Sequence, residues 1–276
     1  MLIVSRIKLK GHLVRRSRVN IKSLSEKIPI EETIKAIEFI KYERHIEKLK
    51  EYLDDLMPFG EKAAVKYRNK FIQRFVEIDG QEIIYSPILK FINGIDSFQV
   101  KKEVIFFIVC TTSDAVGQIV KAFSMGIIPK SIDSNRLLDI FSESMPEAKE
   151  SSVNKTYSIV TTILNDFNII NSKNDEERGD KVYVLNINLR PSNEGILFNL
   201  YYEFLNIRGN KMPEEKLFLE CDTFKCFLMS DLMKKRYIKW MIDKKYLELY
   251  VMGGNANYQF AFDSLDLLVE QVIDCD

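Results

Sequence analysis

Hydrophobic positions recur at helical spacing through most of the first 125 residues. In segment 29–57, isoleucine and leucine return every three or four positions, with charged residues between them, a spacing that places an apolar stripe on one face of a helix. Segment 61–77 repeats this pattern, and segment 98–124 is apolar enough on all sides to predict a buried helix. We therefore predict a helical N-terminal domain over residues 1–125.

The pattern changes after residue 126, where predicted helices are followed by strand-like sequence. Residues 133–141 and 151–167 have helical spacing, and residues 182–189 alternate between apolar and polar positions as a strand does. A helix, a turn, a second helix and a two-stranded ribbon follow one another in this order in a winged helix-turn-helix. We predict a winged-helix module over residues 126–192.

A similar order of elements returns, less completely, in the C-terminal part of the chain. Residues 195–207 and 229–243 are predicted helices, and residues 246–262 contain two alternating segments around a Gly-Gly-Asn turn, which is typical of a hairpin. We predict a second winged-helix-like module over residues 193–276. The predicted fold class is therefore mainly α with small β wings: an N-terminal helical domain followed by two winged helix-turn-helix-like modules.

The net charge of zero hides an uneven distribution of charged residues. The chain of 276 residues contains 40 Lys+Arg and 40 Asp+Glu, and this balance at first argues against nucleic-acid binding. Residues 1–22, however, contain seven basic residues and no acidic one, so the rest of the chain carries −7. Arg15, Arg16 and Arg18 of this basic arm are candidates to neutralise DNA phosphates. The alternative is a solvated surface with no ligand.

Three predicted helices add further candidate DNA contacts. A recognition helix presents short polar and basic side chains near its N-terminal end, and helix 151–167 has such residues opposite its apolar stripe. The helices 61–77 and 229–243 carry basic residues that suit phosphate contacts. The candidate DNA-binding residues of the three helices are Ser151, Ser152, Asn154 and Lys155; Lys62, Lys66, Lys70 and Arg74; and Lys234, Lys235 and Lys239.

Two observations favour a structural interpretation of these residues instead. Residues 127–192 contain 8 basic and 10 acidic residues, so this module has no basic excess of its own. On the C-terminal helix, Asp231 and Asp243 are spaced to pair with Lys235 and Lys239 at i,i+4. Both modules could therefore serve in protein contacts.

The sequence lacks the usual signals of membrane proteins, secreted proteins, metalloproteins and several classes of enzyme. The longest strongly apolar run has seven residues, residues 104–110, against the roughly 20 that a membrane span needs, and no signal-peptide pattern is present. Four scattered cysteines predict reduced thiols, and the two histidines lie far from any cysteine pair, so no metal site is expected. Phosphate-loop, dinucleotide-binding and hydrolase motifs are absent as well. We expect a cytoplasmic, non-enzymatic protein without a cofactor.

Three segments are similar to segments of a known protein family. The first segment, residues 62–75, is a predicted helix that has two alanines near its start and ends in Arg-Phe. The second, residues 151–170, is a predicted helix that begins with serines and leads into a strand. The third comprises residues 228–265 near the end of the sequence. Together they resemble the BrxA family of bacterial BREX phage-defence systems, although Asn168 stands where that family has a glycine. The resemblance implies a small non-enzymatic component that binds DNA and works beside a methyltransferase and ATPases of the same defence locus.

These observations lead to one functional interpretation and two alternatives. The interpretation is a DNA-binding accessory protein of a BREX-type phage-defence system, which contacts double-stranded DNA through its basic arm and winged-helix modules and works with other subunits of that system. The first alternative is a protein-interaction scaffold that does not touch DNA. The second is a transcriptional regulator, for which strong preference for one promoter would be the discriminating property.

Overall fold

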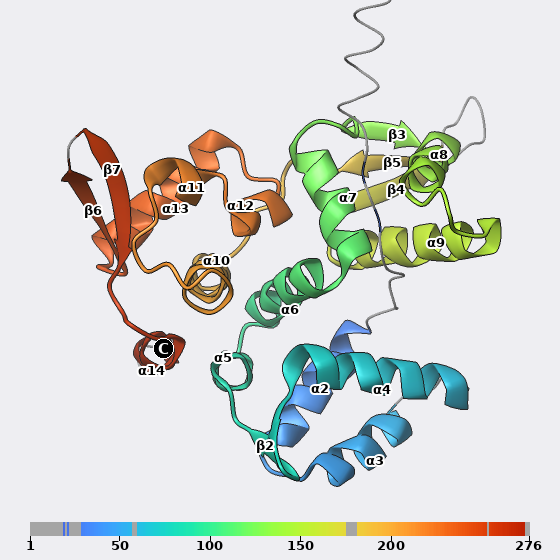
Figure 1. Cartoon of the computed structure of the whole chain (residues 1–276), viewed down its shortest axis with the longest axis horizontal. Coiled ribbons are helices and arrows are strands. Elements are labelled where there is room, and N and C mark those ends of the chain that lie inside the picture. The colour runs from blue at the N-terminus through green and yellow to red at the C-terminus, as the bar shows by residue number, and fades with distance from the viewer. Residues whose placement is uncertain are drawn as a thin grey trace, which may run out of the picture. The chain divides into compact units, whose positions relative to one another are not determined.

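The computed structural model describes residues 19, 21, 29–56, 60–174, 181–252 and 254–273. These residues are mainly helical and include small antiparallel sheets, which confirms the predicted predominance of helices (Figure 1). They form two compact units. The first unit comprises the described part of residues 113–189 with Val19 and Ile21, and the second comprises the described parts of residues 29–112 and 190–273.

The division between the units lies inside a segment that we expected to be one helix. Segment 98–124 contains two helices, α6 (Phe98–Thr112) and α7 (Asp114–Ser124), because Ser113 between them has an extended backbone with φ −110° and ψ 106°. Helix α6 belongs to the second unit and α7 to the first. The helices before Ser113 therefore pack with the C-terminal part of the chain and do not form a unit of their own.

The first unit packs three helices against a three-stranded antiparallel sheet. After α7 its elements are β3 (Ser131–Asp133), α8 (Ser134–Ser144), α9 (Glu150–Asp166), β4 (Ile170–Asn174) and β5 (Lys181–Leu185). Strand β5 lies between β3 and β4, so the strand that precedes the helices pairs with the second strand of the hairpin. The sequence predicted the ribbon but not β3, which has too few residues to show an alternating pattern.

Two polar residues define the ends of helices in this unit. The carboxylate of Asp133 accepts a hydrogen bond of 2.7 Å from the backbone N–H of Arg136 and so caps α8. Asn168 follows α9 with φ 59°, a left-handed conformation that asparagine tolerates better than most residues. This conformation turns the chain from α9 into β4, which explains why a glycine would also suit the position.

The first part of the second unit is built around the buried helix α6. Its other elements are α2 (Ile30–Ile40), α3 (Ile46–Leu56), α4 (Glu61–Phe75), the hairpin of β1 (Glu77–Asp79) and β2 (Glu82–Ile84), and α5 (Pro87–Gly94). Helices α2, α4 and α5 all contact α6, and α3 packs on α2 and α4. Residues 103–110 of α6 are buried without interruption, as the apolar sequence predicted.

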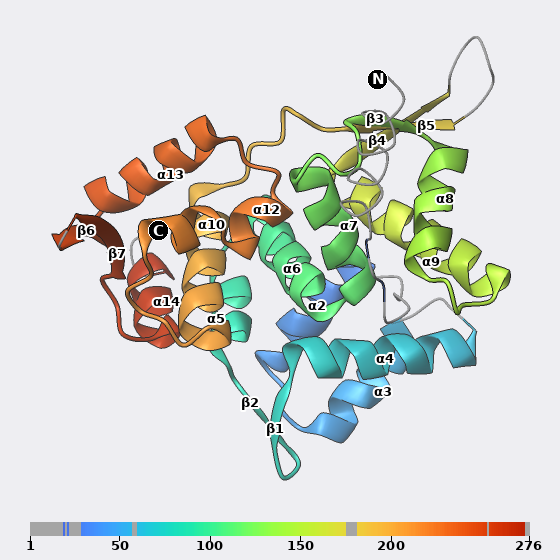
Figure 2. The same cartoon turned by 45° about the horizontal axis from the view of Figure 1, so that its top comes forward.

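The C-terminal part of the second unit continues with short helices and a hairpin (Figure 2). Its elements are α10 (Asn193–Tyr201), which continues as the π-helix η1 (Tyr202–Ile207), then α11 (Glu215–Leu219), α12 (Asp222–Cys226), α13 (Asp231–Asp243), β6 (Leu247–Met252), β7 (Asn255–Phe260) and α14 (Leu265–Ile273). Helix α10 packs against α6, α14 and α13, which joins both parts of the chain in one core.

An extended segment before α11 pairs with the hairpin that follows α13. Glu214 and Asn257 form an isolated antiparallel bridge, and the backbone N–H of Tyr258 donates to the carbonyl of Pro213 at 2.9 Å. The pairing partner is β7, the second strand of the hairpin. Both units therefore have the same order, in which a helix, a short extended segment, further helices and a hairpin follow one another, and the extended segment pairs with the second hairpin strand.

Within the described parts of the chain, no single helix is both long enough and apolar enough to cross a membrane.

Candidate nucleic-acid interface

The outward side of α9 carries the polar residues that the sequence singled out. Ser151, Asn154 and Lys155 are exposed and Ser152 is half-buried, while the apolar stripe of the helix is buried. The ammonium group of Lys155 has no ion-pair partner among the residues that the structure describes. This side of α9 can therefore offer short hydrogen-bonding groups and one free cation to a ligand.

Two further cations, which the sequence pattern did not identify as candidate contacts, lie on the hairpin that follows α9. Lys173 on β4 and Lys181 on β5 are both exposed, and the Lys181 ammonium lies 5.1 Å from the ring centre of Tyr183. Basic residues on either side of a predicted hairpin turn were the signal that could have identified them. They add positive charge to the first unit, in which the outward side of α9 contributes one exposed lysine, Lys155.

Helix α13 presents a larger group of cations. Residues 231–245 contain six basic and two acidic residues. Lys235 and Lys239 are exposed, as is Arg236, and none of the three has an ion-pair partner within the described ranges. The expected pairs of Lys235 with Asp231 and of Lys239 with Asp243 are not formed there.

Lys234 on the same helix is less available than its neighbours. Its ammonium group lies 3.2 Å from the carboxylate of Asp231, and its side chain is only 13% exposed. The acidic residue therefore pairs at i,i+3 with Lys234, which leaves Lys235 free. Of the three predicted phosphate contacts on α13, the structure makes Lys235 and Lys239 accessible and holds Lys234 against its own helix.

The four predicted cations of α4 are also unequal. Lys62 and Lys66 are exposed and without an ion-pair partner in the described part of the chain. Lys70 is half-buried and donates a hydrogen bond of 3.0 Å to the Gln73 side chain, and Arg74 is half-buried and interacts with its surroundings. The half of α4 nearer its N-terminus is therefore the part that can meet a ligand.

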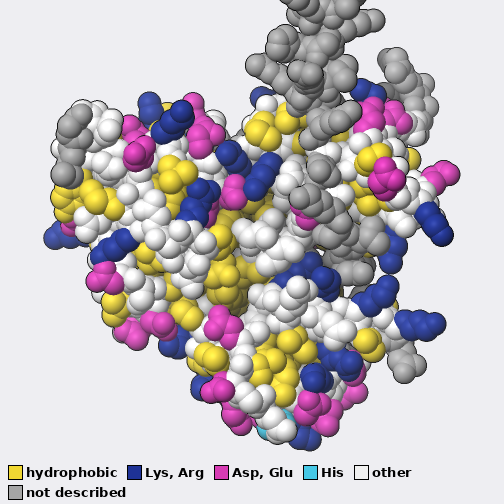
Figure 3. Space-filling view, viewed as in Figure 1, with side chains coloured by type: hydrophobic (Ala, Val, Ile, Leu, Met, Phe, Trp, Pro, Cys, Tyr) yellow, Lys and Arg dark blue, Asp and Glu magenta, His cyan; other side chains and the backbone are white. Residues whose placement is uncertain are grey.

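Helices α4 and α13 lie at different ends of the second unit in both views (Figures 1 and 2). The structure therefore does not bring their cations into one patch. On the face drawn in Figure 3, the basic side chains of the described residues are interspersed with acidic ones. Arg15, Arg16 and Arg18 of the predicted basic arm lie outside the described residues.

No group of three or more His, Cys, Asp or Glu side chains in the described ranges is placed to hold a metal ion. Cys110, Cys221 and Cys226 are buried, free thiols. Burial raises the pKa of Cys221, and a hydrogen bond to Cys110, together with burial, raises the pKa of Cys226. Cys221 and Cys226 therefore stay protonated, and all three buried thiols belong to the core.

Comparison with known proteins assigns no relative to this chain. No protein-family model matches it, and no curated protein matches its sequence.

Proposed function

We propose that this chain is a non-enzymatic DNA-binding accessory protein, in which residues 126–192 and residues 193–276 form two winged-helix modules. In this proposal α13 contacts the phosphate backbone of double-stranded DNA through Lys235 and Lys239, and α9 reads base edges through Asn154 and Lys155. The role beside other subunits of a BREX-type phage-defence system rests on the resemblance of the sequence segments to the BrxA family. Lys62 and Lys66 would add phosphate contacts from α4.

The order of elements supports the winged-helix part of the proposal. In a winged helix-turn-helix, a helix precedes the recognition helix, and the hairpin that follows forms the wing. Helix α9 is followed by the hairpin β4–β5, and α13 is followed by the hairpin β6–β7. In both units an extended segment from before these helices pairs with the second strand of the hairpin. In this proposal, α9 and α13 are the recognition helices of the two modules.

The observation that carries the proposal is the set of unpaired cations on α13. Lys235, Arg236 and Lys239 are exposed and have no acidic partner among the described residues. No ion pair with a described residue offsets the repulsion among these three cations. A polyanion would remove this repulsion and release the counterions that it carries.

A salt series with duplex DNA tests this proposal. Fluorescence anisotropy of a labelled duplex should show binding that weakens steeply with salt, because each engaged phosphate adds about −0.9 to the slope of log K against log salt. The double variant Lys235→Ala/Lys239→Ala should make the slope shallower by roughly 2. The matched control is Lys48→Ala/Lys50→Ala on α3, where both lysines already pair with Glu51 and Glu47. Absence of duplex binding at low salt would overturn the proposal.

One observation favours the alternative function, a protein-interaction scaffold. Leu232 on α13 and Val251 on β6 are each 70% exposed, and exposed apolar residues on one module suit a protein partner. Size-exclusion chromatography with candidate subunits of the defence system, comparing the wild type with Leu232→Ser/Val251→Ser, distinguishes the two functions. A complex that forms without DNA and is lost in this variant would favour the scaffold.

A further inference from the structure

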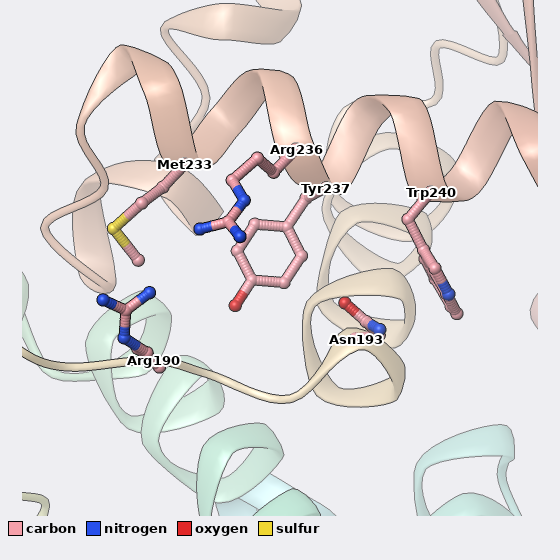
Figure 4. A pocket seen from close by; sticks show the side chains of 6 residues that line it. All are labelled: Arg190, Asn193, Met233, Arg236, Tyr237 and Trp240. Carbon is pink, nitrogen blue, oxygen red and sulfur yellow. The ribbon is translucent and has the colours of Figure 1, made fainter.

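A pocket of about 270 Å³ lies between α13 and the segment that leads into α10. Its lining consists of Arg190, Asn193, Met233, Arg236, Tyr237 and Trp240. Figure 4 shows the guanidinium groups of Arg190 and Arg236 on the same side of the Tyr237 ring, with the Asn193 carboxamide between Tyr237 and Trp240. The pocket therefore has a strongly cationic end and an aromatic end.

The wall that carries Arg190 and Asn193 is held in place by two partly buried contacts. The hydroxyl of Tyr237 donates a hydrogen bond to the carbonyl of Pro191. The backbone N–H of Ser192 donates to the carboxylate of Glu103 at 3.0 Å. Because these contacts fix the residues on either side, the pocket is formed before a ligand arrives, which reduces the ordering cost of binding.

The two arginines of the pocket are not neutralised by the protein. Neither Arg190 nor Arg236 has a hydrogen bond or an ion pair with any described residue. Burial raises the pKa of Tyr237, and the negative charges of two carboxylates, those of Glu103 and Glu194, contribute to the raised pKa. Glu103 is 3% exposed and is occupied by Ser192 and Gln99. Neither Glu103 nor Glu194 lines the pocket, so the two guanidinium groups are the charged groups of its lining.

The chemistry of this lining identifies a ligand class. Two guanidinium groups bind phosphate oxygens through paired, charge-assisted hydrogen bonds. A tryptophan ring stacks on nucleobases, and a carboxamide can hydrogen-bond to a base edge. The volume lies slightly below the roughly 300–1,000 Å³ of pockets for drug-sized ligands, which suits a small ligand with one ring system and one phosphate.

We propose that this pocket binds a nucleoside monophosphate, with the phosphate between Arg190 and Arg236 and the base against Trp240. The ligand is either a free mononucleotide or the phosphorylated end of a nucleic-acid strand, since both present the same group. The site goes beyond the proposed duplex contacts, because Arg190 and Asn193 are not part of the exposed cationic side of α13.

The pocket contains its own reporter for a binding experiment. Trp240 is the one tryptophan in the sequence, so its fluorescence responds to events in the pocket. A titration of the full chain with adenosine monophosphate should change this fluorescence, and isothermal titration calorimetry should give the same affinity. Adenosine and inorganic phosphate should each bind at least about tenfold more weakly, because each lacks one half of the recognised group. Equal affinity for inorganic phosphate and the monophosphate would overturn the assignment of a nucleoside.

Single-stranded oligonucleotides with and without a 5′-phosphate distinguish the two sources of the ligand. A phosphorylated oligonucleotide that binds more tightly than the free monophosphate assigns the pocket to strand ends, and the reverse order assigns it to free nucleotides. Either order supports the pocket. Lack of binding by every phosphate-bearing probe, measured by calorimetry, would overturn it.

Three variants separate the pocket from a general effect of charge and from the duplex contacts. Arg190→Gln should weaken monophosphate binding at least about tenfold, and Trp240→Ala should weaken it while leaving binding of inorganic phosphate unchanged. Lys239→Gln is the matched control, because Lys239 is a cation of α13 that does not line the pocket. It should retain monophosphate affinity and lose duplex affinity. Failure of duplex binding with retained monophosphate binding would overturn the proposed function alone, and the opposite result would overturn only the pocket.

Discussion

The carboxylate of Glu103 on α6 accepts hydrogen bonds from both the backbone N–H and the hydroxyl of Ser192, the residue that caps α10. These residues lie 89 positions apart in the chain. The Ser192 hydroxyl in turn accepts a hydrogen bond of 3.0 Å from the N–H of Gly195. This contact joins the N-terminal and C-terminal parts of the second unit at a buried point and positions the segment that forms the pocket wall.

The Glu103 contact should contribute measurably to stability. Glu103→Ala would leave the donors of Ser192 unpaired in a buried position and should lower the free energy of unfolding by about 2–3 kcal/mol. Glu103→Gln retains an acceptor oxygen and should cost less than about 1 kcal/mol. Urea unfolding followed by circular dichroism measures both values. Equal loss in the two variants would show that the hydrogen bonds do not matter.

The same residue should make stability depend on pH. Burial raises the pKa of Glu103 above its ordinary value, against the opposing effect of the hydrogen bonds from Ser192 and Gln99. The folded state therefore binds the proton more tightly than the unfolded state, and stability falls as pH rises from the ordinary value through the raised one. The difference in unfolding free energy between the wild type and Glu103→Gln should shrink over that range. A difference that grows with pH would contradict the assignment.

Gly195 should not tolerate a side chain. A Cβ at this position would collide with the Glu103 carboxylate and lie 2.7 Å from the Ser192 hydroxyl oxygen. Gly195→Ala should therefore lower the free energy of unfolding by about 1–3 kcal/mol, although alanine is the better helix former. Gly60→Ala is the control, since a Cβ there meets nothing within 4 Å, and thermal unfolding should show a smaller change for it.

The helix α9 should influence which DNA sequence is preferred. Asn154→Ala/Lys155→Ala removes the amide that we propose reads a base edge, together with an exposed cation. The ranking of duplexes in a binding selection should therefore change, with about 1–3 kcal/mol less discrimination at a contacted base pair. Lys235→Ala/Lys239→Ala should weaken all duplexes alike. Arg136→Ala on α8, an exposed residue that pairs with Asp139, serves as the control. An unchanged ranking in the α9 variant would exclude base reading by this helix.

The three buried thiols should be inert in the folded protein. Burial keeps Cys221 protonated, and the hydrogen bond to Cys110 together with burial keeps Cys226 protonated, whereas the thiolate is the reactive form. Cys110 is buried as well, so a reagent does not reach it in the folded protein. Peptide mapping after alkylation at neutral pH should therefore find Cys110, Cys221 and Cys226 unmodified until urea is added. Rapid labelling of any of the three under native conditions would show that the core of the second unit opens readily.

The sequence by itself determined the type and approximate position of most helices and of both larger hairpins. Helical and alternating spacings are local properties, because they depend on which side of an element must be buried. The same spacing correctly indicated that Asn154 and Lys155 face outward on α9 and that Lys235 and Lys239 do so on α13. The outward direction of these side chains follows from the period of about 3.6 residues of an α-helix and does not depend on contacts between distant parts of the chain.

The tertiary structure decided how these elements associate. The extended backbone at Ser113 divides an apolar segment between two units, and β7 pairs with the segment before α11 in addition to β6. The contact of Glu103 with Ser192 and the approach of Arg190 to Arg236 join residues that are distant in sequence. Such contacts arise from packing and buried hydrogen bonds, which no local spacing encodes, and so only the folded chain shows the pocket.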